Sequence, residues 1–196
     1  EQTQVILREI EALKNMASGS YQQSLPQTLD IGIIPTLAPY IFSPVNALCQ
    51  ENFPEIELEI HEAQSQQLLT LLESNAIKCA IITSTGNSGK YVELPLFDEP
   101  LMLGVSHQHP WARLNDITMA HLKSSKILMI DDGSCLHRQI LEYCYQFELE
   151  PDSRFAAMHL ETLRRSVAFN RGVSFFPLLS TRHGDNENIK YLRCLG

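Results

Sequence analysis

Residues 127–147 read ILMIDDGSCLHRQILEYCYQF, and this stretch combines the two patterns that decide the fold class. The four apolar residues Ile127–Ile130 predict a short buried strand. After Ser134, apolar side chains recur at helical spacing on one face, which predicts a helix: Leu136, Ile140, Cys144 and Phe147. A strand that leads through a short polar loop into a helix is the repeating unit of a mostly parallel α/β sheet.

The same alternation of strand and helix extends along the chain from residue 28. The predicted strands are Leu29–Ile34, Ile56–His61, Cys79–Thr83, Val92–Leu96, Leu101–Ser106, Ile127–Ile130, Arg154–Ala157, Val173–Phe176 and Ile189–Leu192. The predicted helices are Leu37–Asn52, broken early by Pro39 and Pro44, Ser65–Ser74, the helix after Ser134, and Leu160–Ala168.

The alternation restarts after residue 98, which predicts a boundary there between subdomains 28–98 and 99–196. Residues 3–17 are amphipathic at helical spacing but have no place in a compact core. We therefore expect residues 1–27 to be the end of a linker helix and a linker.

Composition excludes several classes of protein. The net charge is −8 with a pI of about 5.3 and no stripe of Lys and Arg, so this chain should not bind nucleic acid alone. No stretch approaches the roughly 20 apolar residues of a membrane span, and the N-terminus does not resemble a signal peptide. Five cysteines, an odd number, fit no closed disulfide framework and predict a cytoplasmic location.

Cys135 and Cys144 are nine residues apart within the predicted helix. Nine helical steps place the two sulfur atoms on opposite sides and roughly 13 Å apart along the axis. A disulfide needs Cα atoms about 5.5 Å apart. These cysteines can therefore pair only if the helix unravels.

Cys135 occupies the first turn of that helix, where the positive end of the helix dipole favours thiolate over thiol. His137 and Arg138 add possible positive charge nearby. A thiolate attacks the O–O bond of a peroxide to give a sulfenic acid, which a second thiol such as Cys144 captures. Spacing alone favours a plainer alternative, in which Cys135 is idle and Cys144 only fills the core.

Three predicted strand-to-helix junctions carry a hydroxyl group, from Thr36, Ser65 and Ser134. Helix capping is the more typical role of each one. Together they indicate a binding site for a small polar or anionic ligand, because such junctions line the ligand crevice of parallel α/β sheets.

The remaining cysteines, Cys49, Cys79 and Cys194, lie in or beside apolar segments, which favours structural burial. Glu161 and Arg164, three residues apart on one helix, are typical of a surface ion pair.

Neither a metal ion nor another cofactor is predicted. The pairs Cys135-x-His137 and His107-x-His109 come without a second pair at zinc-site spacing. The chain also has neither a Gly-rich phosphate loop nor a nucleophile elbow.

Several segments are similar to the regulatory domain of the OxyR branch of the LysR-type transcriptional regulators, which senses hydrogen peroxide. The resemblance runs in register from about residue 28 to residue 196. It is carried by GIIPTLAPY (32–40), HEAQSQQLL (61–69), PLFDEP (95–100), HPWA (109–112), LETLR (160–164) and the Cys135–Cys144 pair.

The resemblance implies a periplasmic-binding-protein-like fold of two Rossmann-like subdomains joined by crossover strands. It implies Cys135 as the peroxidatic cysteine and Cys144 as its resolving partner, with Thr36 and Ser65 beside the peroxide. Oxidation would rearrange a dimer or tetramer on promoter DNA, and a thiol reductant such as glutaredoxin or glutathione would reset it. The DNA-binding domain would precede residue 1, and the rest of the first subdomain would follow Gly196.

Two positions depart from that family. The histidine that usually precedes the reactive cysteine is Ser134 here, and the Arg-Asp pair that follows Cys-Leu is His137-Arg138. Ser134 donates a hydrogen bond but supplies no positive charge. We therefore place Ser134 and His137 among the candidate ligand-binding residues.

The prediction is the sensor domain of a peroxide-responsive transcription activator, which is not an enzyme. The first alternative is a LysR-type effector domain that binds a small anionic metabolite, with incidental cysteines. The second alternative is a thiol-dependent peroxidase or a solute-binding protein. Missing peroxidase motifs argue against the peroxidase, and the missing signal peptide argues against the solute-binding protein.

Overall fold

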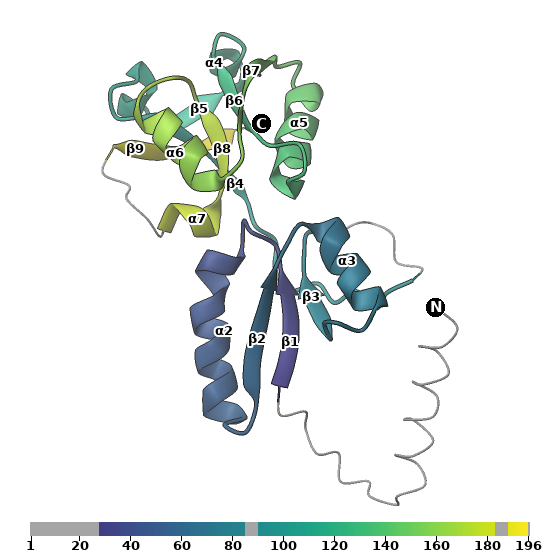
Figure 1. Cartoon of the computed structure of the whole chain (residues 1–196). Helices are drawn as coiled ribbons and strands as arrows, with labels where there is room; N and C mark the ends of the chain where they lie inside the picture. Colours follow the sequence, from purple (N-terminus) through teal and green to yellow (C-terminus); the bar gives the residue numbers. More distant parts are fainter. Residues whose placement is uncertain (1–27, 85–89, 183–187, 196) are drawn as a thin grey trace, which may run out of the picture.

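The computed structural model describes residues 28–84, 90–182 and 188–195, and Figure 1 shows that they form two lobes. The lower lobe consists of β1 (Thr28–Ile33), α2 (Ala38–Asn52), β2 (Glu57–Glu62), α3 (Ser65–Glu73) and β3 (Cys79–Ile81). Its sheet has the order β2-β1-β3, and both pairings are parallel. Strand and helix alternate here as the sequence predicts.

The upper lobe contains the remaining elements. They are β4 (Leu101–Ser106), the 3-10 helix η1 (Pro110–Arg113), β5 (Asp116–Thr118), α4 (Met119–Leu122), β6 (Ile127–Ile130), α5 (Cys135–Gln146), β7 (Pro151–Ala157), α6 (Leu160–Ala168), β8 (Ser174–Pro177), α7 (Leu178–Arg182) and β9 (Ile189–Leu195). β5, β9, β4 and β8 form one sheet in that order, and β6 pairs with β7 in parallel. A parallel bridge from Ile127 to Val173 connects the two groups of strands.

Each lobe has its own apolar core. The lower core centres on Ile33 and Leu68, both fully buried, and Cys135 of the upper lobe packs against it. The upper core is larger and includes Leu136, Ile140 and Cys144 from α5. The two cores draw on residues on either side of residue 98, which supports the predicted boundary near that residue; the boundary itself stays a prediction.

The predicted α/β class is confirmed, and most predicted elements lie within a few residues of their expected bounds. The break predicted at Pro44 is wrong, because α2 continues through it. The strand predicted at Val92–Leu96 is also wrong: this segment is not assigned to a strand, and its apolar side chains are exposed. The helix predicted at 3–17 lies outside the described residues.

The two lobes meet at the carboxyl ends of β1 and β6. Thr36 follows β1, Cys135 follows β6, and their side chains are in contact. In Figure 1, α5 of the upper lobe stands above α3 of the lower lobe. Parallel α/β sheets bind ligands outside the carboxyl ends of their strands, so this junction is the place to look for a site.

Candidate functional site

Cys135 lies at the junction of the lobes, in the first turn of α5. Its side chain is half-buried, and its Sγ is 3.9 Å from Oγ1 of Thr36, within hydrogen-bonding range for sulfur. Thr36 is itself buried. A thiolate at Cys135 accepts the hydroxyl proton of Thr36 and also faces the positive end of the α5 dipole. The structure thus places the Cys135 sulfur beside a buried hydroxyl group and at the start of a helix.

A tight turn delivers Cys135 to this position. The backbone N–H of Ser134 donates to the carbonyl of Asp131 at 3.1 Å, which closes the loop between β6 and α5. At Gly133 a Cβ atom would lie 2.3 Å from Nε2 of Gln64, so the amide of Gln64 occupies the space that any other residue would fill. Glycine therefore lets the lower lobe approach within two residues of the cysteine.

The three hydroxyl groups lie in three different local settings. Ser134 is the N-cap of α5, because its side chain accepts a hydrogen bond from the N–H of Leu136 at 3.2 Å. Thr36 caps no helix, and its hydroxyl faces Cys135 instead. Ser65 is the first residue of α3, whose N-cap is Gln64. Capping thus accounts for Ser134, whereas the ligand-binding roles of Thr36 and Ser65 stay predictions.

His137 turns toward strand β6. Its Nδ1 is 2.7 Å from the carbonyl oxygen of Ile130. A carbonyl only accepts, so Nδ1 carries the proton and donates. This bond joins the first turn of α5 to the end of β6 across the loop that precedes Cys135. A role of His137 in ligand binding stays a prediction.

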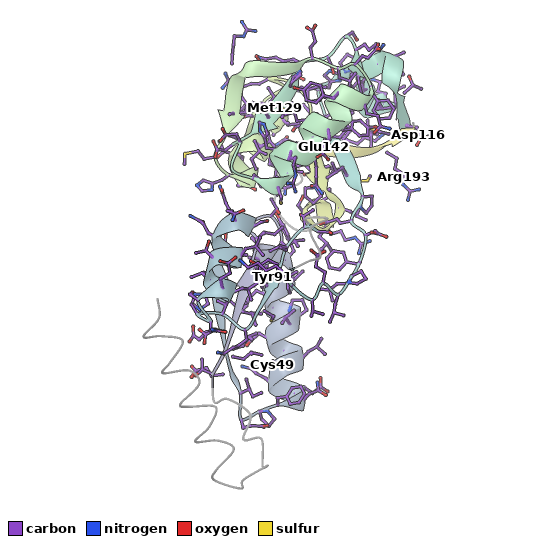
Figure 2. The ribbon with its side chains drawn as sticks, turned by 90° about the vertical axis from the view of Figure 1, so that its right-hand side faces the viewer. Cys49, Tyr91, Asp116, Met129, Glu142 and Arg193 are labelled. Carbon is purple, nitrogen blue, oxygen red and sulfur yellow. The ribbon has the colours of Figure 1, made fainter. Side chains whose placement is uncertain are left out.

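We expect His137→Ala to lower the free energy of unfolding of the dithiol form by about 1–2 kcal/mol, the value of a lost hydrogen bond. Arg138→Ala is the control. Arg138 pairs with Glu142, which Figure 2 labels, at 3.9 Å; both side chains are exposed, and such pairs contribute about 0.5 kcal/mol or less. Urea denaturation of both variants measures the difference. Equal stabilities would show that the His137 bond contributes nothing.

Cys144 is 1% exposed and packs in the upper core on the inner face of α5. Burial raises the pKa of its thiol to about 11, so it is a protonated thiol at neutral pH. Because both cysteines belong to one continuous helix, their sulfur atoms are separated by roughly nine residue rises, about 13 Å. All five cysteines are free thiols in this structure.

We expect Cys144 to resist alkylation in the native dithiol form. With a pKa of about 11, about one thiol in a thousand is ionised at pH 8, so iodoacetamide should label it about 100-fold more slowly than in the unfolded chain. Labelling should accelerate about tenfold per pH unit toward pH 11, since the raised pKa keeps the thiol protonated below it. Mass spectrometry of labelled peptides measures the rates, with the exposed Cys79 as reference. Labelling of both cysteines at one rate would contradict this expectation.

The other cysteines are less buried than predicted. Cys79 is exposed, so the prediction of burial is wrong for it, whereas Cys49 and Cys194 are half-buried. Cys49 lies on α2 in the lower lobe, toward the end of that helix distant from the upper lobe (Figure 2). Within the described residues, no cluster of three His, Cys, Asp or Glu side chains is placed to hold a metal ion. No helix of the described part is long and apolar enough to cross a membrane.

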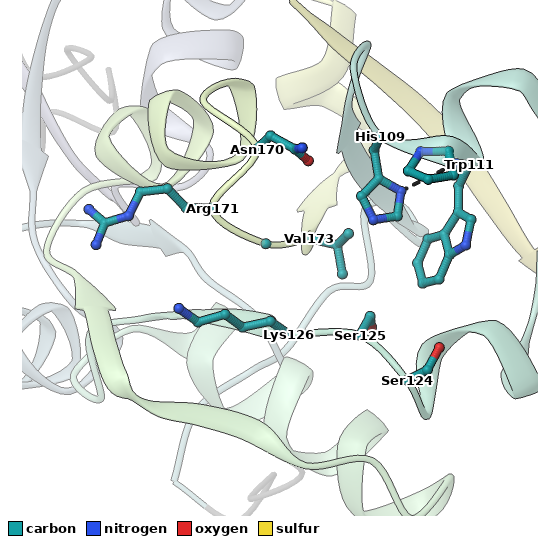
Figure 3. Close-up of a pocket in the computed structure, with 10 residues that line it drawn as sticks. His109, Trp111, Ser124, Ser125, Lys126, Asn170, Arg171 and Val173 are labelled. Atoms are coloured by element: carbon teal, nitrogen blue, oxygen red, sulfur yellow. Dashed lines mark hydrogen bonds between the residues drawn. The ribbon is translucent and has the colours of Figure 1, made fainter.

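A separate hollow of about 490 Å³ lies in the upper lobe, between the start of η1, the segment that precedes β6 and the segment that precedes β8 (Figure 3). Lys126 and Arg171 extend away from His109 and Trp111 on its other side. Lys126 is paired with Asp152 at 3.0 Å. Cys135 follows the opposite end of β6, so this hollow has no part in the cysteine site.

Sequence reasoning missed Gln64, which contacts Gly133 across the lobes. Because Gln64 directly precedes the predicted site residue Ser65, it could have been considered as a site residue too. Its contact with Gly133, however, depends on how the two lobes are placed. Arg164 was expected on the surface and is instead buried, with its Nη2 3.5 Å from the Tyr40 hydroxyl of the lower lobe. Helical spacing does not reveal which face of α6 is covered.

The chain belongs to the LysR substrate binding domain family, whose family model matches residues 22–194. Among the most similar relatives is the hydrogen peroxide-inducible genes activator of Pectobacterium carotovorum, 39% identical over 195 residues, which cover 99% of this chain and 64% of the relative. The DNA-binding transcriptional dual regulator OxyR of Escherichia coli K12 is 37% identical over 196 residues, 100% of this chain and 64% of the relative. The chain thus spans about 64% of the length of these relatives.

Solved structures of OxyR have the same fold. The reduced form superposes with a TM-score of 0.76 at 35% identity, covering 86% of this chain and 79% of the other. The oxidized form gives a TM-score of 0.74 at 36% identity, covering 86% and 80%. The predicted periplasmic-binding-protein-like architecture is thereby confirmed.

Proposed function

We propose that this chain is the regulatory domain of a LysR-type transcription regulator that senses hydrogen peroxide through a reversible Cys135–Cys144 disulfide. The observation that carries the proposal is the position of Cys135: it begins α5, faces the Thr36 hydroxyl, and shares the helix with a buried second thiol. The names of the relatives, and the existence of reduced and oxidized OxyR structures, support it.

In the first step the Cys135 thiolate attacks one oxygen of hydrogen peroxide. The S–O bond forms as the O–O bond breaks, and the departing hydroxide takes up a proton to become water. Thr36 donates to the thiolate or to a peroxide oxygen, since its hydroxyl lies 3.9 Å from the sulfur. Ser134 holds the first turn of α5 in place, and Ser65 at the start of α3 is a further candidate contact for the peroxide.

In the second step the Cys144 sulfur attacks the Cys135 sulfenic acid. The S–S bond forms, the S–O bond breaks, and the hydroxyl leaves as water with the proton of Cys144. The sum is one peroxide and two thiols converted to one disulfide and two waters. Because a helix holds the two sulfurs apart, α5 unravels before this step, and Cys144 leaves the core.

The free-energy cost of unravelling α5 is of the same order as the free energy that disulfide formation can supply. Unravelling about two turns of α5 exposes Leu136, Ile140 and Cys144, which costs a few kcal/mol before the new conformation packs. For a two-electron couple, 30 mV corresponds to about 1.4 kcal/mol, so a modest shift in reduction potential offsets that cost.

In this proposal the domain reacts once per cycle and is a sensor, not an enzyme. The rearranged helix alters a dimer or tetramer, which changes how a DNA-binding domain outside this chain engages promoter DNA in the cytoplasm. A thiol reductant such as glutathione or glutaredoxin returns the disulfide to two thiols. Neither a metal ion nor another cofactor takes part.

The test is peptide mapping under non-reducing conditions after one equivalent of hydrogen peroxide. We expect a linked Cys135–Cys144 peptide in the wild type. In Cys144→Ser we expect a Cys135 sulfenic acid that dimedone traps. Cys49→Ser, on α2 of the lower lobe, is the matched control and should form the linked peptide normally.

Absence of the linked peptide in the wild type would overturn the proposal. Tight binding of a small anionic metabolite that Cys135→Ser leaves unchanged would support the alternative of a metabolite-responsive domain. Sustained turnover of peroxide with a reductant would instead indicate a peroxidase.

A further inference from the structure

Two contacts from the lower lobe meet the start of α5. One is the Thr36 hydroxyl, whose oxygen is 3.9 Å from the Cys135 sulfur. The other is the side-chain amide of Gln64, which lies against Gly133, two residues before that cysteine. On the upper lobe only one residue separates the two points of contact. A change in the spacing of the lobes at one contact therefore also changes the other.

The backbone of Gln64 is held in place by its own lobe. Its N–H donates to Oε1 of Gln67 at 3.4 Å, and its carbonyl accepts from the N–H of Leu68 at 3.0 Å. Directly before it, the N–H of Ala63 donates to the carbonyl of Ile33, at the end of β1, at 3.4 Å. The α-carbon of Gln64 is therefore fixed at the carboxyl end of the lower sheet, and its side chain reaches across to the upper lobe.

The other side of this contact is the backbone at Gly133. A Cβ atom added there would lie 2.5 Å from Oε1 and 2.8 Å from Cδ of Gln64, closer than such atoms pack. The backbone of Gly133 is outside the left-handed region, so it is the Gln64 amide that leaves no room for a larger residue. The bond from the Ser134 N–H to the Asp131 carbonyl closes the loop. The amide thus packs on a backbone segment of defined shape.

We infer that Gln64 is a positioning residue for the reaction of Cys135 with peroxide. Its contact with Gly133 sets the spacing of the lobes at which the Thr36 hydroxyl lies near the sulfur. This rests on the proposed function, in which Thr36 donates to the thiolate or to a peroxide oxygen. Gln64 acts through Thr36 and is assigned no contact with the reacting atoms. Because a hydrogen bond weakens steeply as its geometry degrades, loss of this spacing slows the first step.

The experiment measures the second-order rate constant for oxidation of Cys135 by hydrogen peroxide in the full-length protein. Gln64→Ala removes the contact, and we expect the rate constant to fall about 5-fold, the value of one hydrogen bond that is no longer aligned. Gln64→Met keeps the length of the side chain, so it should retain most of the wild-type rate. Gln66→Ala is the matched control, since Gln66 is an exposed glutamine in the first turn of α3, and its rate should not change.

Two double-mutant cycles separate this role from a general effect on the fold. Thr36→Val removes the hydroxyl, so Gln64→Ala should slow the Thr36→Val variant no further. Gly133→Ala displaces the same amide and should slow the wild type about 5-fold, but it should not slow Gln64→Ala, where the added methyl group meets no amide. Gln64 and Gly133 are both exposed, so each of their single variants should melt within about 2 °C of wild type.

A wild-type rate for Gln64→Ala would overturn the inference, and so would a Gln64→Met variant as slow as Gln64→Ala. Further slowing of the Thr36→Val variant by Gln64→Ala, or of the Gln64→Ala variant by Gly133→Ala, would overturn it as well. A wild type whose Cys135 does not react with peroxide would instead overturn the proposed function.

Discussion

Cys135→Ser is expected to abolish the fast reaction of this chain with hydrogen peroxide. Serine keeps the size of the side chain but offers no thiolate to attack the peroxide. Burial raises the pKa of the Cys79, Cys144 and Cys194 thiols, which makes these three poorer nucleophiles than a free cysteine. We expect the rate of thiol loss to fall about 100-fold, measured by stopped-flow or quenched labelling.

Cys79→Ser is the control that distinguishes the reactivity of a thiol from its exposure to peroxide. Cys79 is the most exposed of the five cysteines, so a reaction governed by access alone would occur there. It lies in β3, away from any helix N-terminus, and we expect its removal to leave the fast phase unchanged. A fast phase lost with Cys79 and kept without Cys135 would reverse the assignment of the reactive thiol.

Arg164→Met is expected to lower the free energy of unfolding by about 3 kcal/mol. The guanidinium group of Arg164 is buried and donates to the Tyr191 hydroxyl, to the Ser180 carbonyl at 2.8 Å and to Glu161 at 3.1 Å. Methionine fills much of the volume but leaves the buried acceptors without this donor. For a domain of this size the loss corresponds to a decrease of roughly 6–12 °C in the melting temperature.

Arg165→Met is the matched control for this measurement. Arg165 is the next residue of α6 and pairs with the same Glu161, at 3.0 Å, but the pair is exposed. Exposed ion pairs contribute about 0.5 kcal/mol or less, so the melting temperature should change by no more than about 2 °C. Similar losses for both variants would show that the buried position of Arg164 confers no special stability.

Arg164 also shows where sequence reasoning fails. An arginine three residues after a glutamate has the same appearance in the sequence whether the helix face is exposed or covered. Its partners Tyr191 and Tyr40 are 27 and 124 residues away, so only the packing of α6 between distant elements reveals the burial.

The fold class was predictable because each strand-and-helix unit carries its own periodicity. The errors arose where tertiary packing overrides a local rule. Pro44 removes a backbone donor, yet α2 continues through it. Val92–Leu96 has the composition of a strand, but pairing decides whether a strand forms, and these residues have no partner strand in the described part of the chain.

The candidate site was predictable in part for the same reason. The position of Cys135 at a helix start follows from local pattern, and the structure agrees. The proximity of Thr36 to its sulfur joins residues 99 apart and depends on how two lobes are placed. No periodicity encodes that distance, and the resemblance to a known family was the signal that indicated it.

The burial of Cys144 has a consequence for the timing of any response. While the core retains this thiol, a sulfenic acid on Cys135 has no intramolecular partner, and small thiols in solution compete to repair it. In the proposed mechanism, repair by small thiols would then reverse a brief oxidation before α5 opens, whereas sustained oxidation would allow the disulfide to form. Burial of Cys144 would thus set a delay between oxidation of Cys135 and the structural change.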